Sequence, residues 1–276
     1  MLWPADTDKR LFLFAVVLYG VSSLYSIFLL RTGFRQDNRI NYLLLLLAAG
    51  LHTIAMFQRG FSLQRCPINN LYEATMFIGW TIVAAYLLIG VWSRLRFLGA
   101  FASPVIFAIG VFALMPQLDP PHAGHPTFTG GWMSLHAALI LLSYGAFGLS
   151  AVAALMYLNQ EHNLKFHKLR AVSSLFPPIQ RLEIIIGWLL LAGLVLLTGG
   201  LVAGAIWLKQ THGVYFKEDS KIFWSLFVWV LYLTLLVLRW GFAQRGRRFA
   251  LGALGSFAFV LLTFWGFNLL SGIHNP

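Results

Sequence analysis

Long apolar stretches, separated by short polar connections, dominate the pattern of this chain. A membrane-spanning helix needs about 20 mainly apolar residues, and eight stretches qualify, at roughly 11–30, 40–58, 73–92, 97–115, 133–158, 184–208, 222–238 and 250–270. In hydrocarbon every backbone polar group needs a partner within the protein, so we expect each stretch to be a helix. The pattern predicts an all-α polytopic membrane protein with about eight transmembrane helices, forming a single domain over residues 1–276.

The composition supports the membrane class. Of the 276 residues, 59% are hydrophobic and 11% are charged, whereas a soluble domain carries about 25% charged residues. The net charge of +11 would suggest nucleic acid in a soluble protein, but these connections are too short to form a nucleic-acid domain. Cys66 is the only cysteine, which excludes an internal disulfide and any Cys-x-x-Cys motif.

The basic residues predict an orientation. Connections on one side of the eight stretches hold 13 of the 20 Lys and Arg residues, and the other side holds seven, namely Lys9, Arg10, Arg59, Arg65, Lys209, Lys217 and Lys221. Cytoplasmic connections carry the excess of Lys and Arg. We therefore expect both termini to face outward, together with the connections at 116–132 and 209–221, in a bacterial inner (plasma) membrane.

Two patterns of small and polar residues predict helix packing. Ser143 and Ser150 lie seven residues apart, on the same side of one expected helix as His136, and we interpret both serines as contacts between helices. Gly200 and Gly204 form a Gly-x-x-x-Gly contact face on the next expected helix. Residues 171–183, which contain Pro177 and Pro178, are too short and polar to span a membrane.

Histidines at the ends of apolar stretches are the main candidates for chemistry. His136 lies near the start of one such stretch and His274 just past the end of another, and the predicted topology puts both on the outer side. Two neutral imidazoles can hold a haem iron. His52 lies within an apolar stretch, where it is either a functional group or a neutral side chain bonded to a neighbouring helix. Aromatic residues around 207–224 fit either an interfacial belt or the walls of a haem pocket.

Four stretches resemble the cytochrome c assembly family of haem-handling membrane proteins (CcsA/ResC/CcmC type), particularly its CcsA, HemX and YpjD branch. Residues 66–73, Cys-Pro-Ile-Asn-Asn-Leu-Tyr-Glu, are similar to the family's Pro-x-Ser-Asn-Leu-Tyr-Glu-Ser. Residues 132–157 resemble its histidine-bearing helix, and residues 182–207 its next span. Residues 257–274 are similar to its ending Gly-Val-Asn-x-Leu-Leu-x-Gly-Leu-His. The resemblance covers about residues 40–274.

The resemblance implies that His136 and His274 are axial ligands of a non-covalent, b-type haem. It implies that the pocket walls and propionate contacts come from Trp132, Tyr215, Asp219, Lys221 and Trp224, with His52 and His212 as possible additional ligands. The family's tryptophan-rich loop is only partly kept, since His212, Phe216 and Glu218 stand in place of tryptophans, and Ser220 in place of a proline. Val237 stands about where assembly members carry another histidine.

The expected function is therefore to hold haem at the outer membrane face for delivery to apocytochrome c. A second biogenesis membrane protein of the CcsB/ResB type would present the apocytochrome, and no partnership with nucleic acid is expected. The sequence contains no catalytic triad, nucleophile–base pair or phosphate loop, so we expect a haem-handling protein, possibly a subunit of a cytochrome c synthase complex, rather than a conventional enzyme. Two alternatives stay open: a HemX-like regulator of haem biosynthesis, and a YpjD-like membrane scaffold without haem.

Overall fold

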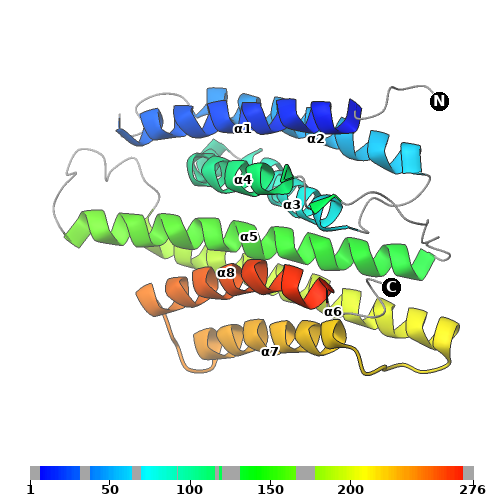
Figure 1. Ribbon diagram of the computed structural model, residues 1–276. Coiled ribbons are helices and arrows are strands. Elements are labelled where there is room, and N and C mark those ends of the chain that lie inside the picture. The colour runs from blue at the N-terminus through cyan, green and yellow to red at the C-terminus, as the bar shows by residue number, and fades with distance from the viewer. Residues whose placement is uncertain are drawn as a thin grey trace.

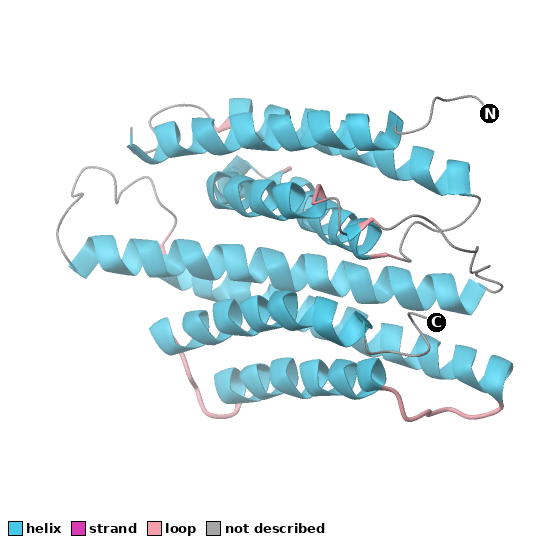
Figure 2. Ribbon diagram, in the orientation of Figure 1, coloured by secondary structure: helices cyan, strands magenta, loops and turns pink. Residues whose placement is uncertain are grey.

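The computed structural model describes residues 7–31, 38–63, 70–91, 93–115, 118–119, 131–165 and 178–269. Helices account for nearly all of these residues, and none of the described segments forms a strand (Figure 1, Figure 2). In chain order the elements are α1 (Thr7–Arg31), α2 (Arg39–Leu63), α3 (Leu71–Gly90), the 3-10 helix η1 (Ser93–Leu98), α4 (Gly99–Ala113), α5 (Gly131–Lys165), α6 (Ile179–His212), α7 (Ser220–Trp240) and α8 (Arg247–Leu269). Each predicted apolar stretch coincides with one α-helix, which confirms the all-α class.

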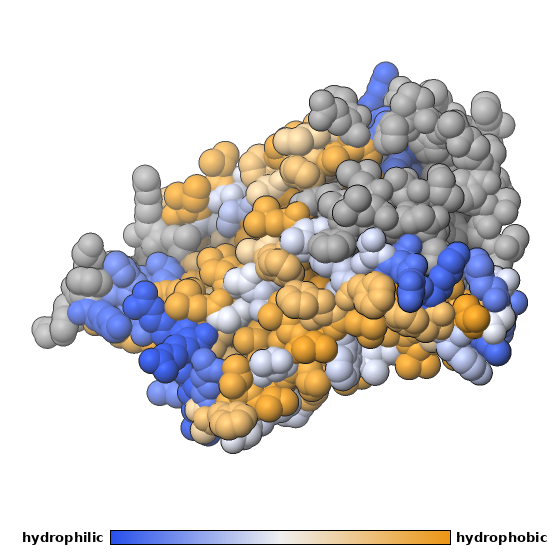
Figure 3. Space-filling model, turned by 60° about the horizontal axis from the view of Figure 1, so that its bottom comes forward, coloured by the Kyte–Doolittle hydropathy of each residue, from blue (hydrophilic) through white to orange (hydrophobic). Residues whose placement is uncertain are grey.

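The helices have the length and surface of a membrane bundle. Seven spans, which include α1 to α7, are long and apolar enough to cross a bilayer. The 23 residues of α8 coincide with the eighth predicted stretch, whose role as a span stays a prediction. Figure 3 shows an apolar band across one face, with hydrophilic residues gathered at both ends. The protein is therefore a polytopic membrane protein.

The helices lie side by side, with α1 and α2 at one edge and α7 at the opposite edge (Figure 1). Between these edges α5 packs against α3 on one side and against α6 and α8 on the other, and it is the most buried of the candidate spans. We call the end where α1, α3, α5 and α7 begin, and α8 ends, the His136 end; the opposite end is the Arg239 end.

Close approach of α5 to its neighbours depends on glycine. A Cβ added at Gly145 in α5 would lie 2.6 Å from the Cβ of Thr81 in α3, and one added at Gly193 in α6 would collide with the ring of Phe147 in α5. Phe147 in turn stacks on Tyr232 in α7, with ring centroids 3.6 Å apart. Small residues permit such contacts where no water drives helices together, so these glycines set the spacing of the bundle.

The start of α6 shortens the 171–183 connection expected from the sequence. The prolines do interrupt helix, since α6 starts at Ile179 directly after Pro178. The last five residues of that segment, however, belong to α6, and its first turns carry Glu183. Glu183 pairs with Arg239 of α7 at 2.6 Å, and both side chains are largely buried. A polar residue that looked like part of a connection therefore ties α6 to α7.

An ion cluster closes the His136 end of α1 to α4. Arg59 near the end of α2 donates to Glu73 of α3 at 2.9 Å, to Asp8 of α1 at 3.1 Å and to Asp119 beyond α4 at 2.6 Å. Lys9 adds a second cation, 2.7 Å from Asp119. Removing one partner from a buried ion pair leaves an uncompensated charge, which costs about 3–5 kcal/mol, so the cluster fastens four segments to one another.

Replacing Gly145 by alanine should destabilise the bundle, because the new methyl group would meet the side chain and backbone of Thr81. Overpacking of this kind costs about 1–3 kcal/mol. The matched control is Gly50→Ala in α2, where an added Cβ has nothing within 4 Å. Thermal unfolding in one detergent should show a lower midpoint for Gly145→Ala alone; equal midpoints for the two variants would contradict the packing described.

The stability of the ion cluster should fall at acid pH. Burial alone would raise the pKa of Asp119, but the hydrogen bond from Lys9 and the charge of Arg59 outweigh burial and hold that pKa below its usual value. The stabilisation from Asp119 is thus complete above the unfolded pKa of about 3.9 and is lost as pH falls through the lower folded pKa. Between about pH 5 and pH 2.5, the unfolding midpoint should drop more steeply for the unmutated protein than for Asp119→Asn; parallel curves would refute this.

Candidate functional site

His136 lies in the second turn of α5, half-buried against α6. Its Nδ1 lies 2.7 Å from the carbonyl oxygen of Gly200. A carbonyl oxygen can only accept a hydrogen bond, so Nδ1 carries the proton and donates it to Gly200. The neutral ring then keeps a free electron pair on Nε2, the arrangement found in metal-binding histidines whose other nitrogen donates to a backbone carbonyl.

Gly200 and Gly204, the predicted contact face, pack against α5 at and beside this ring. A Cβ at Gly200 would lie 2.7 Å from Cδ1 of Ile140, and a Cβ at Gly204 would lie 2.6 Å from Nδ1 of His136. The Gly-x-x-x-Gly face therefore packs on α5, as the sequence predicted. Ser150 also donates from α5 to the carbonyl of Ile186 in α6 at 3.4 Å, which agrees with its interpretation as a contact between helices.

The start of α7 brings three of the sequence-predicted residues to the His136 end. The carboxylate of Asp219 caps α7 by accepting the backbone N–H of Lys221 at 2.9 Å. The positive charge of Lys221 acts electrostatically on His136. Trp224 is buried, packs edge-on against Tyr144 of α5 and donates its indole N–H to Thr263 of α8 at 3.0 Å. Trp224 therefore joins the start of α7 to α5 and α8, about two helical turns of α5 beyond the histidine.

The other residues predicted to line the site lie on the surface. Trp132 is 39% exposed and Tyr215 is 64% exposed, and Lys209 covers one face of the Tyr215 ring at 5.1 Å. His212 is exposed, with its Nδ1 2.8 Å from the hydroxyl of Thr211. The structure thus brings the charge of Lys221 close to the α5 histidine and packs Trp224 further along α5, but leaves the loop aromatics facing outward.

His274, the second predicted axial ligand, lies outside the described part of the chain. The helix that precedes His274, α8, ends at Leu269 at the His136 end (Figure 1). The pairing of His274 with His136 stays a prediction.

His52 is enclosed between α1, α2 and α3. Its Nδ1 lies 3.1 Å from the hydroxyl of Tyr19, and Phe12 packs on its ring with centroids 4.8 Å apart. Its Nε2 makes no hydrogen bond within the described residues. The contact with Tyr19 is the bond to a neighbouring helix that one of the two sequence-based readings expected. Because only 1% of its surface is exposed, this ring is closed to a porphyrin in the structure.

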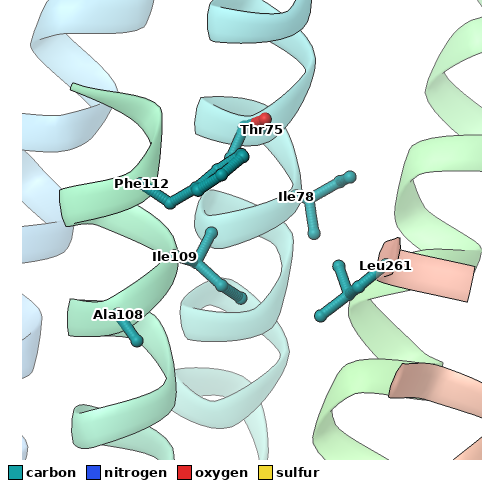
Figure 4. Close-up of a pocket in the computed structure, with 6 residues that line it drawn as sticks. All are labelled: Thr75, Ile78, Ala108, Ile109, Phe112 and Leu261. Atoms are coloured by element: carbon teal, nitrogen blue, oxygen red, sulfur yellow. The ribbon is translucent and has the colours of Figure 1, made fainter. Parts of the chain in front are cut away.

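A small crevice lies between α3, α4 and α8 (Figure 4). Its volume is about 180 Å³, below the roughly 300–1,000 Å³ of ordinary ligand pockets. Apart from one threonine its lining is apolar, and it consists of Thr75, Ile78, Ala108, Ile109, Phe112 and Leu261. The crevice does not include His136, so it is separate from the histidine site.

The ion cluster contains residues whose contacts sequence reasoning missed. Asn70 caps α3 by accepting the backbone N–H of Glu73 at 2.8 Å and also donates to Asp119 at 2.6 Å. The guanidinium of Arg59 lies over the ring of Tyr72 at 4.9 Å. The Asn-Leu-Tyr-Glu motif at 70–73 is thus the part of α3 that receives Arg59. The only signal in the sequence was the resemblance of this motif, because Arg59 itself looked like an ordinary connection residue.

At the Arg239 end, an ion pair lies close to position 237, where the resemblance implies that other family members carry a histidine. Val237 is 47% exposed. Arg239, two residues further on, pairs with Glu183 and lies over the ring of Phe249 at 4.5 Å. Gly187 makes room for it, since an added Cβ there would lie 2.9 Å from the Arg239 Nε. This end of α7 is therefore built as a helix contact.

The comparisons with known proteins assign the chain to a family. The family described as Cytochrome C assembly protein matches residues 68–274, which is most of the 276 residues. The chain therefore belongs to the cytochrome c assembly protein family.

Relatives within this family carry the name cytochrome c biogenesis protein CcsA. The one from Mesostigma viride is 25% identical over 305 aligned residues, covering 98% of this chain and 95% of the relative. The one from Prochlorococcus marinus subsp. pastoris is 29% identical over 232 residues, covering 76% and 74%. The one from Guillardia theta is 28% identical over 256 residues, covering 86% and 85%.

Proposed function

We propose that this protein binds haem at its His136 end and delivers it to apocytochrome c. The observation that carries the proposal is the hydrogen bond from His136 Nδ1 to Gly200, because it leaves Nε2 free to ligate iron. His136 is one axial ligand in this proposal and His274 is the other. Membership of the cytochrome c assembly family supports a role in cytochrome c biogenesis.

The residues around His136 fit a haem group. Trp224 and Tyr144 form an aromatic contact about two helical turns further along α5 than the histidine, and Lys221 provides a positive charge close to it, where a propionate could be neutralised. Asp219 positions Lys221 by capping its helix. Bound haem supplies the iron and the vinyl groups that react with the two thiols of a Cys-x-x-Cys-His motif in the apocytochrome. The protein's own contribution is to bind the haem and to orient it.

Partners and location complete the proposal. The apocytochrome brings the thiols, and a second membrane protein of the CcsB/ResB type presents it. The His136 end faces outward from a bacterial inner membrane, because the connections at the Arg239 end carry most of the Lys and Arg residues. The protein acts as an assembly factor for other proteins.

Two alternatives have specific observations in their favour. The predicted loop aromatic Tyr215 is exposed rather than turned toward His136, and the tryptophan-rich loop is incomplete. A HemX-like regulator of haem biosynthesis would tolerate both features, as would a YpjD-like scaffold. Either alternative predicts that His136 is dispensable, whereas haem delivery requires it.

The orientation can be measured by thiol labelling. In a Cys66→Ser background, Lys217→Cys at the His136 end and Arg245→Cys at the Arg239 end introduce exposed thiols. A membrane-impermeant maleimide added to spheroplasts should label Lys217→Cys directly, and Arg245→Cys only after permeabilisation. The reverse pattern would place the His136 end in the cytoplasm and exclude delivery at the outer face.

Haem binding can be measured by absorption of the purified protein. The unmutated protein should show a Soret band and reduced bis-imidazole features, both lost or shifted in His136→Ala and in His274→Ala, because an axial ligand is removed. We expect haem affinity to fall at least about tenfold, since even a contact supporting a ligand is worth 10–100-fold.

The control for this measurement is His162→Ala, which removes an exposed histidine near the other end of the same helix and should leave the spectrum unchanged. No haem in the unmutated protein, even after reconstitution with excess haem, would leave the regulator or the scaffold. An unchanged spectrum in His136→Ala would show that haem binds through other ligands.

A further inference from the structure

We propose that Gly204 and the carbonyl of Gly200 are positioning elements of the haem site, which fix the His136 ring so that Nε2 is the iron ligand and so tune the reduction potential of the iron. This inference rests on the proposed function. It concerns residues of α6 that do not touch haem and that are otherwise explained as helix packing alone.

Gly200 and Gly204 act together, because the first supplies the carbonyl and the second leaves it uncovered. In an α-helix the carbonyl of residue 200 accepts the N–H of residue 204, and each Cβ points back toward the helix N-terminus. A side chain at position 204 would therefore cover the carbonyl of Gly200. An added Cβ there lies 2.6 Å from His136 Nδ1 and 2.9 Å from its Cε1. Only glycine at 204 leaves the carbonyl open to the imidazole.

Packing alone does not explain this contact. A carbonyl oxygen has two acceptor positions, and in a membrane helix the second one is normally unused. Here it receives the proton of a half-buried imidazole at 2.7 Å, which is at the short end for an N–H···O bond. The contact selects one of the two neutral forms of the ring, because the Nε2–H form would turn a lone pair toward the carbonyl oxygen.

The consequence for a bound iron follows from the hydrogen bond. A histidine that donates its second N–H to a carbonyl is a more basic ligand, and a more basic ligand favours the ferric over the ferrous state. Hydrogen bonds around the axial ligand are among the means by which proteins tune haem. Loss of the Gly200 contact should therefore weaken haem binding and shift the reduction potential to more positive values.

The test compares two glycine-to-alanine variants on the same helix. Gly204→Ala displaces the His136 ring. Gly199→Ala instead adds a Cβ 3.5 Å from Cδ1 of Leu139, which is an ordinary van der Waals contact. Both changes raise helix propensity equally. Relative to the unmutated protein, haem affinity in Gly204→Ala should fall by about 10–100-fold and the potential should move positive, while Gly199→Ala keeps both values.

A second measurement is made on the apoprotein and needs no haem. Nitrogen NMR of the ¹⁵N-histidine-labelled apoprotein at neutral pH should show one imidazole protonated at Nδ1 and bare at Nε2, whose signals disappear in His136→Ala. An Nε2–H form at His136 would overturn the inference.

The outcomes separate this inference from the function on which it rests. Haem bound equally well, and at the same potential, in Gly204→Ala and in the unmutated protein would overturn the positioning role but leave haem binding intact. Absence of haem from the unmutated protein would overturn the proposed function and this inference together. In that case the NMR result would still show whether the hydrogen bond to Gly200 exists.

Discussion

Close contact between α5 and its neighbours is the constraint on which the rest of the structure depends. Lipid is as apolar as the helix surfaces, so burial of apolar area does little to hold the helices together, and van der Waals packing and polar contacts must do so. Along α5 the packing relies on positions without a side chain: Gly145 against Thr81, Gly148 against Ile82, and Gly200 of α6 against Ile140. The same spacing admits His136 to the backbone of α6, so packing and site share one structural cause.

Charges inside the bundle follow a second rule, which is that each has a partner. Arg59 has three carboxylate partners at the His136 end, and Arg239 has Glu183 at the other end. A charge buried in this way without a partner would be costly. The two clusters join helices that are not held by glycine contacts alone: Arg59 joins α1, α2 and α3, and Arg239 joins α6 and α7. They explain how a chain with few charged residues can bury several of them.

The two halves of the bundle, α1 to α4 and α5 to α8, use their polar groups differently. The half formed by α1 to α4 contains the ion cluster and the enclosed His52, and its polar groups are largely used in holding helices together. The half formed by α5 to α8 contains His136, whose second nitrogen is free of the contact with Gly200, and the charged first turn of α7 beside it. The haem binding that we propose is therefore assigned to the half formed by α5 to α8, with the α1 to α4 half as its support.

The sequence by itself determined the eight helices, the membrane class, the Gly-x-x-x-Gly contact and the choice of His136, because apolar length, helical spacing and an isolated histidine are local properties. The structure decided which groups meet. The partners of Arg59 lie 14, 51 and 60 residues away in the chain, and the acceptor for His136 lies 64 residues away. In the sequence Arg59 and Glu183 look like connection residues, and Tyr215 looks like part of a pocket. No local pattern encodes the packing of distant helices. Only the tertiary structure could give Arg59 and Glu183 their separate partners, leave Tyr215 on the surface and show that the Gly200 contact uses Nδ1 of His136 rather than Nε2.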